Sequence, residues 1–156
     1  MKFIVCSDNH GDIVTLRKIV EKHPDASAYL HCGDIELESS LVPEFKVVRG
    51  NNDYFYNYPE QIVTTVGDLR VLITHSHLLP FGNRIKALSE LAQKHQCDIA
   101  CFGHTHRYQV EYYENILCIN PGSLYYNRDG SKPSYAVVTV EKGEINVQRM
   151  LAEDLF

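Results

Sequence analysis

Histidine, aspartate and asparagine side chains recur in five short blocks that extend over two thirds of the chain. The blocks read S-D-N-H-G, H-C-G-D, G-N-N-D, T-H-S-H and G-H-T-H, and each follows a short apolar run. The candidate ligands in them are Asp8, His10, Asp34, Asn51, His75, His104 and His106. A mixed set of carboxylate, amide and imidazole groups suits Mn²⁺, Fe, Ni²⁺ or Zn²⁺. The sequence therefore predicts a metal site.

Each block taken alone has an ordinary structural explanation. A single aspartate after a strand is usually a turn residue or a helix cap, and a single histidine is usually a satisfied hydrogen-bonding group. We interpret His23, His31 and His95 in that way. Five blocks that recur at the ends of apolar runs are better explained together, as ligands that the fold brings to one place.

The spacing within two blocks suggests how the ligands are presented. Asp8 and His10 are two residues apart, and they would share one face of an extended segment. The same argument applies to His104 and His106. A glycine near a candidate ligand lets the backbone turn sharply at the end of a strand. In three blocks a glycine directly precedes the candidate ligand: Gly33, Gly50 and Gly103.

Hydrophobic patterning predicts the elements that carry these blocks. Ten runs are typical of strands: Lys2–Cys6, Ala26–His31, Phe45–Val48, Gln61–Val66, Leu69–Thr74, Asp98–Phe102, Tyr108–Tyr113, Ile116–Ile119, Tyr135–Val140 and Ile145–Met150. Asp12 and Asn83 are predicted N-caps of two helices, which should end before Pro24 and near His95. Residues 36–43 are expected to form a single helical turn.

The order of these elements predicts one α/β domain, residues 1–156, with two sheets. The strand–helix–strand start favours a parallel sheet. Gly67-Asp68 favours a hairpin, and the last four strands are expected to form an antiparallel series. Ligands of open α/β sheets bind at the carboxyl ends of strands. Five candidates follow predicted strands by one to three residues: Asp8, Asp34, Asn51, His75 and His104.

Composition argues against two classes of protein. The net charge is -5 and no basic run occurs, whereas proteins that read duplex nucleic acid concentrate Lys and Arg on one face. No apolar stretch reaches the ~20 residues that span a bilayer. The first block also begins too early for a signal peptide to precede it. We therefore expect that the protein binds no duplex nucleic acid, is not associated with a membrane and is cytoplasmic.

The five cysteines are Cys6, Cys32, Cys97, Cys101 and Cys118. Their number is odd and no C-x-x-C pair occurs, so we expect reduced thiols buried as small apolar side chains. Cys6 and Cys32 each precede an aspartate of the predicted site by two residues. We nevertheless interpret both as packing residues rather than ligands.

The five blocks, in this order, resemble the motifs D-x-H, G-D, G-N-H-[DE], G-H and G-H-x-H of the calcineurin-like metallophosphoesterases. The resemblance extends from Met1 to about Ser123, and the short chain with N-P-G-S at 120–123 is most similar to the compact YfcE-type phosphodiesterases. It implies the calcineurin-like phosphoesterase sandwich, with two facing β-sheets flanked by helices. It also implies two divalent metal ions, Mn²⁺ first and Ni²⁺, Fe or Zn²⁺ as alternatives.

The resemblance assigns a role to each ligand. Asp8, His10 and His106 would hold one ion, Asn51, His75 and His104 the other, and Asp34 would bridge both. Two ions that share a ligand make hydroxide available near neutral pH. That hydroxide would attack phosphorus in line with the leaving oxygen.

The chain departs from the family pattern at two positions. Asn52 stands where the family has the histidine that helps to protonate the leaving group; asparagine cannot supply that proton but can donate a hydrogen bond to a phosphoryl oxygen. Thr74 precedes His75 where the family has glycine, which affects only the local turn. His77 and Arg128 are further candidates for substrate contact. An exposed loop histidine and a solvated arginine are the alternative interpretations of these two.

Without an acid, a diester with a good leaving group is favoured over a monoester. The predicted function is therefore a metal-dependent phosphodiesterase acting on a small phosphodiester, and a phosphomonoesterase is an alternative. The cluster of Tyr54, Phe55, Tyr56 and Tyr58 could stack on a base or an aryl group, or form a subunit interface or a core rim.

A rival from another class is a protein-binding scaffold of the Vps29 type. Degraded ligands would favour it, whereas all seven ligand positions are intact here. The sequence leaves a homo-oligomer open.

Overall fold

The computed structural model describes residues 1–80 and 82–156. In that part of the chain the elements, in order, are β1 (Lys2–Cys6), α1 (Ile13–Lys22), β2 (Ala28–His31), η1 (Ser39–Leu41), β3 (Phe45–Val47), β4 (Gln61–Val66), β5 (Leu69–Thr74), α2 (Arg84–Lys94), β6 (Ile99–Cys101), β7 (Tyr108–Tyr113), β8 (Ile116–Pro121), β9 (Ser134–Glu141), β10 (Glu144–Leu151) and η2 (Ala152–Leu155). Neither α-helix described is long and apolar enough to cross a bilayer.

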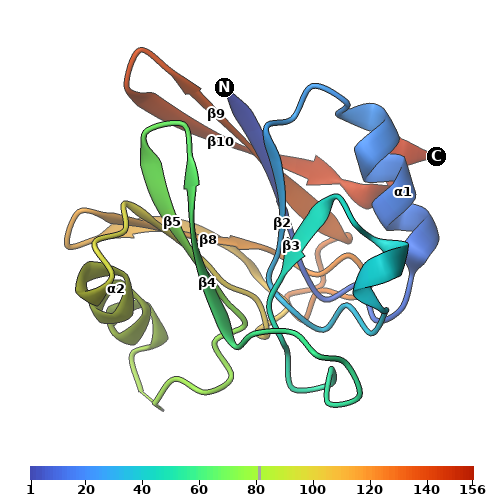
Figure 1. The fold of residues 1–156 in the computed structure, drawn as a ribbon, viewed down its shortest axis with the longest axis horizontal. Helices are drawn as coiled ribbons and strands as arrows, with labels where there is room; N and C mark the ends of the chain where they lie inside the picture. Colours follow the sequence, from blue (N-terminus) through green and yellow to red (C-terminus); the bar gives the residue numbers. More distant parts are fainter. Residues whose placement is uncertain (81) are drawn as a thin grey trace.

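The strands form two five-stranded sheets that face each other (Figure 1). One sheet has the order β10-β9-β1-β2-β3, and the other has the order β4-β5-β6-β8-β7. Each sheet contains three adjacent parallel strands, β1, β2 and β3 in the first and β5, β6 and β8 in the second. The expected parallel start and the expected β4–β5 hairpin are both present.

The last four strands do not form one antiparallel series. β7 pairs antiparallel with β8, and β9 pairs antiparallel with β10, but the two hairpins lie in different sheets. β8 pairs parallel with β6, whereas β9 pairs antiparallel with β1. The prediction is right within each hairpin and wrong between them, because alternation in a strand shows which residues are buried but not which neighbour the strand pairs with.

Alternate residues of the buried strands pack into different cores. Phe3 and Val5 of β1 lie between the two sheets, whereas Ile4 packs with Leu16 and Ile19 of α1. β5 and β6 follow the same rule on the other side, where alternate residues pack against α2. The result is a sandwich of two sheets with α1 covering one and α2 covering the other, as Figure 1 shows. This is the fold class that the sequence predicts.

The residues interpreted as structural have structural contacts. All five cysteines are free and buried, with Cys6 in the core beneath α1 and Cys32 between the sheets. His23 hydrogen-bonds the hydroxyl of Tyr135, and His31 hydrogen-bonds the side chain of Asn9. His95 Nε2 is 3.1 Å from the amide nitrogen of Gln61. The structure supports these interpretations.

Both helices begin where the sequence predicts. The side chain of Asp12 accepts a hydrogen bond from the backbone N–H of Thr15, and that of Asn83 accepts one from Lys86. Such N-caps satisfy amide groups that the first helical turn leaves without partners. The capped start of α1 fixes the short segment between β1 and the helix, and that segment contains Asp8 and His10.

The parallel strands determine where the five blocks meet. The carboxyl ends of parallel neighbours reach the same edge of a sheet, so the segments that follow β1, β2 and β3 emerge together. The segments after β5, β6 and β8 emerge at the matching edge of the second sheet. Candidate ligands therefore come from both sheets.

Candidate metal centre

The structure brings all seven predicted ligands into one cluster. An unbroken series of polar contacts of 2.9–3.9 Å links their side chains. Each sheet contributes to the cluster, Asp8, His10, Asp34 and Asn51 from one and His75, His104 and His106 from the other. The cluster therefore joins the two sheets at the edge to which their parallel strands lead.

Asp8, His10 and His106 form the first half of the cluster. The Nε2 atoms of the two histidines face each other at 3.4 Å, and His106 Nε2 lies 3.4 Å from Asp8 Oδ1. One donor atom from each of the three residues lies within 4.8 Å of the others. His10 Nδ1 points the other way and hydrogen-bonds Glu36 Oε2 at 2.6 Å.

Asn51, His75 and His104 form the second half. Asn51 Oδ1 is 2.9 Å from His75 Nε2 and 3.1 Å from His104 Nδ1. His75 Nε2 is also 3.4 Å from Asp34 Oδ2 and 3.9 Å from Asp8 Oδ1. Asp8, a member of the first half, thus also contacts the second, and it belongs to two groups of potential ligands, one with His10 and His106 and one with Asp34 and His75.

These donor atoms fit divalent metal ions. Asp8 Oδ1 is buried and has no hydrogen-bond partner within residues 1–80 and 82–156. A buried carboxylate oxygen without a partner is costly, and a cation would satisfy it. Donor atoms about 2.1 Å from one ion stand roughly 3.0–3.4 Å apart in octahedral or tetrahedral geometry. The contacts around His75 and His106 have this spacing.

The motifs D-x-H and G-H-T-H predict an extended backbone, but the backbone that presents the ligands is not extended. Positive φ values occur at Asp8 (55°), His10 (47°), Asp34 (55°), His104 (73°) and His106 (55°). The left-handed region is uncommon for these residue types, and such conformations cluster at functional sites. The predicted extended segment at His104 and His106 is wrong because both residues have positive φ, although His104 contacts the second half and His106 the first, as the resemblance implies.

The glycines of the blocks serve two different purposes. Gly33 has a φ of 101°, so the predicted sharp turn is present there. Gly50 and Gly103 do not have positive φ, and they allow close approach instead. A Cβ atom at Gly50 would lie 2.1 Å from Asp34 Oδ1, and one at Gly103 would lie 2.2 Å from Ser7 Oγ. Larger residues at these two positions would displace the carboxylate groups of the cluster.

Asp53 is a buried residue that connects two of the blocks. Its carboxylate accepts hydrogen bonds from the backbone N–H groups of Asp34 at 2.7 Å, Glu36 at 2.8 Å and Gly50 at 2.8 Å. The segments after β2 and β3 are thereby held together. The position of Asp53 in the G-N-N-D block marks it as a candidate site residue. Its three hydrogen bonds could not be predicted from the sequence, because they join segments that only the fold brings together.

The segment Asn120–Ser123 supports the cluster from behind. The Ser123 hydroxyl donates to the backbone carbonyl of Asp8 at 2.7 Å, and Asn120 Nδ2 donates to Thr105 Oγ1 at 2.9 Å. Ser7 Oγ donates to Asp8 Oδ2 at 2.6 Å. These contacts fix both segments that carry the first half. In the sequence, only the N-P-G-S motif pointed to the supporting role of this segment.

Electrostatics favours charged carboxylates at this site. Burial raises the pKa of Asp8, but His106, His75 and Ser7 outweigh burial and the net pKa lies below its usual range. Asp34 behaves in the same way, with His75 as the main opposing group. Burial and the neighbouring His75 lower the pKa of His104 to about 4. Ionised aspartates and a neutral histidine are the forms that bind metal.

The pKa of His75 is raised above its usual value. Burial alone would lower it, but Asp34 and Asp8 reverse that effect. The acidic pair thus attracts positive charge to the centre of the cluster. A divalent cation in the same position would replace that proton.

The three predicted substrate contacts lie at different places. Asn52 donates from its backbone and side-chain nitrogens to the Asp34 carboxylate at 2.9 and 3.1 Å, so it also holds that side chain. The His77 ring centroid is 5.3 Å from that of His75, and His77 Nδ1 is buried without a hydrogen-bond partner in the described chain. Arg128 is exposed, and its backbone N–H donates to the carbonyl of His106 at 2.9 Å. Their contacts with substrate stay predictions.

Comparison with known structures supports the sandwich fold. A structure of a predicted phosphoesterase from Streptococcus pneumoniae TIGR4 is 31% identical, with a TM-score of 0.90 and coverage of 97% of this chain and 90% of that one. At lower identity the likeness shows the fold alone. Vps29 from Chaetomium thermophilum is 20% identical, with a TM-score of 0.76 and coverage of 96% and 95%. YfcE from E. coli is 21% identical, with a TM-score of 0.68 and coverage of 100% and 96%.

Comparison of sequences identifies the family. A probable metallophosphoesterase of Bacillus subtilis (strain 168), YsnB, is 33% identical over 152 residues, which are 95% of this chain and 89% of that protein. The family model described as the calcineurin-like phosphoesterase superfamily domain matches residues 1–143. The match includes every candidate ligand, so the chain belongs to the calcineurin-like phosphoesterases.

Proposed function

We propose that this protein is a metal-dependent phosphodiesterase that uses two divalent ions, Mn²⁺ first among them, to hydrolyse a small phosphodiester. Family membership makes a hydrolase of phosphate esters the expected class. The observation that carries the proposal is the cluster of seven donor side chains around Asp8 Oδ1, which has no hydrogen-bond partner among the described residues.

The ligands divide between the ions according to the two halves of the cluster. Asp8, His10 and His106 would hold one ion, Asn51, His75 and His104 the other, and Asp34 would bridge both. Contacts within each half support this division. When bound, two such ions supply a hydroxide at neutral pH and neutralise charge on the phosphoryl group.

The surrounding residues keep the ligands in their reactive form and position. Asp53 holds the backbone of Asp34, and Asn52 donates two hydrogen bonds to the Asp34 carboxylate. Glu36 accepts the Nδ1 hydrogen of His10, which leaves the Nε2 lone pair directed into the cluster. The exposed Asn52 retains an amide hydrogen that can reach a phosphoryl oxygen.

A diester is the proposed substrate class because position 52 lacks an acid. The leaving oxygen of a monoester with a poor leaving group needs a proton, and asparagine cannot provide one. A stable leaving group departs from a diester without that proton. A phosphomonoesterase is the alternative within the same family. We also propose a cytoplasmic location, which five unpaired buried cysteines support.

A comparison of substrates tests the proposal. With Mn²⁺ bound, kcat/KM for bis(4-nitrophenyl) phosphate should exceed that for glycerol 2-phosphate, a monoester whose alkoxide leaving group needs a proton. The variant Asp34→Asn should lose turnover by about 100-fold or more, a loss typical of catalytic groups. Asp68→Asn, at the exposed β4–β5 turn, should match the unmodified protein.

Two outcomes would contradict the proposal. A higher kcat/KM for the monoester would identify a phosphomonoesterase instead. Absence of turnover with Mn²⁺, Zn²⁺, Ni²⁺ and Fe²⁺ would favour a protein-binding scaffold of the Vps29 type.

A further inference from the structure

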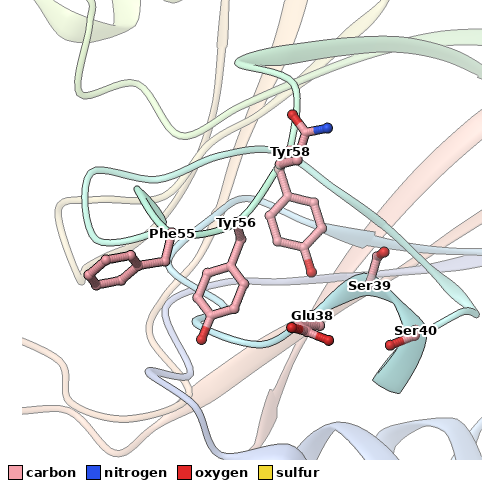
Figure 2. A pocket seen from close by; sticks show the side chains of 7 residues that line it. Glu38, Ser39, Ser40, Phe55, Tyr56 and Tyr58 are labelled. Carbon is pink, nitrogen blue, oxygen red and sulfur yellow. The ribbon is translucent and has the colours of Figure 1, made fainter.

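An open pocket of about 320 Å³ lies beside the segment that carries Asn51 and Asn52. Figure 2 shows that two walls form it. Aromatic side chains make one wall and short polar side chains make the other: Phe55, Tyr56 and Tyr58 against Glu38, Ser39 and Ser40. None of these residues belongs to the metal centre described above.

Both walls are close in sequence to residues that contact the proposed ligands. A chain spans at most about 3.6 Å per residue, so Phe55 lies within roughly 11 Å of Asn52 and Glu38 within roughly 7 Å of Glu36. Asn52 contacts Asp34, and Glu36 contacts His10. The pocket is therefore within reach of a small organic group whose phosphate is at the metal centre.

The walls are held in place by hydrogen bonds. Asp53 accepts from the backbone of Glu36, and the Tyr58 hydroxyl donates to the backbone carbonyl of Leu37. Tyr58 is buried, and this contact joins the aromatic wall to the segment that carries Glu38. A pocket fixed in this way needs little rearrangement to accept a ligand.

The charge of the pocket excludes phosphate as its occupant. Glu38 is exposed, and within the described residues it forms no ion pair, while the lining there contains no lysine or arginine. A carboxylate only accepts hydrogen bonds, so Glu38 favours a neutral group that donates them. The phosphate of a substrate belongs at the metal centre and its uncharged part in this pocket.

The aromatic wall favours a flat ring. The Phe55 side chain is 82% exposed, and its ring centroid lies 4.5 Å from that of Tyr54. An exposed aromatic surface beside a phosphate site is the arrangement with which proteins stack nucleobases, worth about 1–3 kcal/mol per base.

We infer that this pocket holds the base of a nucleoside ester, with the ring stacked on Phe55 and its N–H groups donating to Glu38. Guanine fits best because it presents two neighbouring N–H donors on one edge, whereas uracil presents one between two acceptors. The inference rests on the proposed function for the position of the phosphate, and it narrows the substrate to a nucleoside phosphodiester.

Calorimetry on the Mn²⁺-loaded protein tests this without turnover. The probes are guanosine 5′-monophosphate, uridine 5′-monophosphate and ribose 5-phosphate. Guanosine 5′-monophosphate should bind about 10-fold or more tightly than ribose 5-phosphate, within the roughly 5–150-fold that stacking provides. The uridine compound should lie between the two.

Two variants and one control locate the effect. Phe55→Ala should reduce the affinity for guanosine 5′-monophosphate by about 5-fold or more, toward that for ribose 5-phosphate, which should itself not change. Glu38→Gln should reduce the preference for guanosine over uridine. Tyr112→Ala, which removes an exposed aromatic ring from β7, should alter neither.

Equal binding of guanosine 5′-monophosphate and ribose 5-phosphate by the unmodified protein would overturn the inference. A Phe55→Ala variant that kept the preference would overturn it as well. Turnover of the aryl diester tests the proposed function independently of these binding measurements. Turnover without a base preference would reject the pocket alone, whereas a Phe55-dependent preference without turnover would support the pocket and reject the proposed function.

Discussion

Glu36 offers a test of how the first half of the cluster is organised. Its carboxylate is 2.6 Å from His10 Nδ1, and the side chains of His10 and Glu36 are 21% and 34% exposed. A neutral imidazole has one donor and one acceptor nitrogen, so a hydrogen bond to Glu36 keeps Nε2 free to bind an ion. The substitution Glu36→Ala removes this hydrogen bond and leaves every proposed ligand unchanged.

The expected loss follows from this geometry. Removing the hydrogen-bond partner of a metal-binding histidine typically lowers metal affinity by about 10–100-fold, or roughly 1.4–2.7 kcal/mol. Because a third of the Glu36 side chain is exposed, solvent screening places the effect near the lower end. We therefore expect about 10-fold for Glu36→Ala and less for Glu36→Gln, which retains an acceptor.

The loss should affect one ion only. Glu36 contacts His10, and its side chain makes no hydrogen bond to Asn51, His75 or His104 among the described residues. Calorimetric titration of metal-free protein with Mn²⁺ should show one weakened binding step and one unchanged step. Glu44→Gln, which alters a surface ion pair with Arg17, is the matched control. Equal weakening of both steps, or none in Glu36→Ala, would refute the reasoning.

The remaining predictions concern three other positions. Gly103→Ala should weaken Mn²⁺ binding in the same titration, because its Cβ would lie 2.8 Å from Asp8 Oδ2; unchanged affinity would contradict this. In Asn52→His, the decline of log kcat with rising leaving-group pKa across aryl diesters should become shallower, and an already shallow slope in the unmodified protein would contradict a missing acid. Burial lowers the pKa of His31 to about 3, so the unfolded chain, with a pKa near 6.5, takes up the proton first. Stability of the metal-free protein should therefore decline as the pH falls from 6.5 toward 3. Urea midpoints between pH 7 and 5 should decline less in His31→Gln than in the unmodified protein.

Local features of the sequence were sufficient for most of the fold. The alternation in β1 separates the core between the sheets from the core under α1, and the two caps at Asp12 and Asn83 mark the starts of the helices. These signals depend on neighbours in sequence. The meeting of the ligands was predictable as well, because parallel strands lead their carboxyl ends to one edge.

Features that depend on distant contacts were not predictable. The hydrogen bond between His10 and Glu36 joins residues that follow different strands, and its geometry depends on Asp53 holding the Glu36 backbone. The left-handed backbone at Asp8 and His10 reverses the expectation from extended spacing. Such a conformation carries a local cost, so local preference predicts against it, and only the surrounding contacts maintain it. Partition of β8 and β9 between two sheets is likewise a tertiary outcome.

Metal stoichiometry tests the central claim most directly. Equilibrium dialysis against Mn²⁺, followed by elemental analysis, should find two ions per chain in the unmodified protein. Because Asp34 contacts His75 and is the proposed bridge, Asp34→Ala should lose both ions and aryl-diester turnover together. A single ion per chain in the unmodified protein, or two ions retained by Asp34→Ala, would contradict a centre of two metal ions bridged by Asp34.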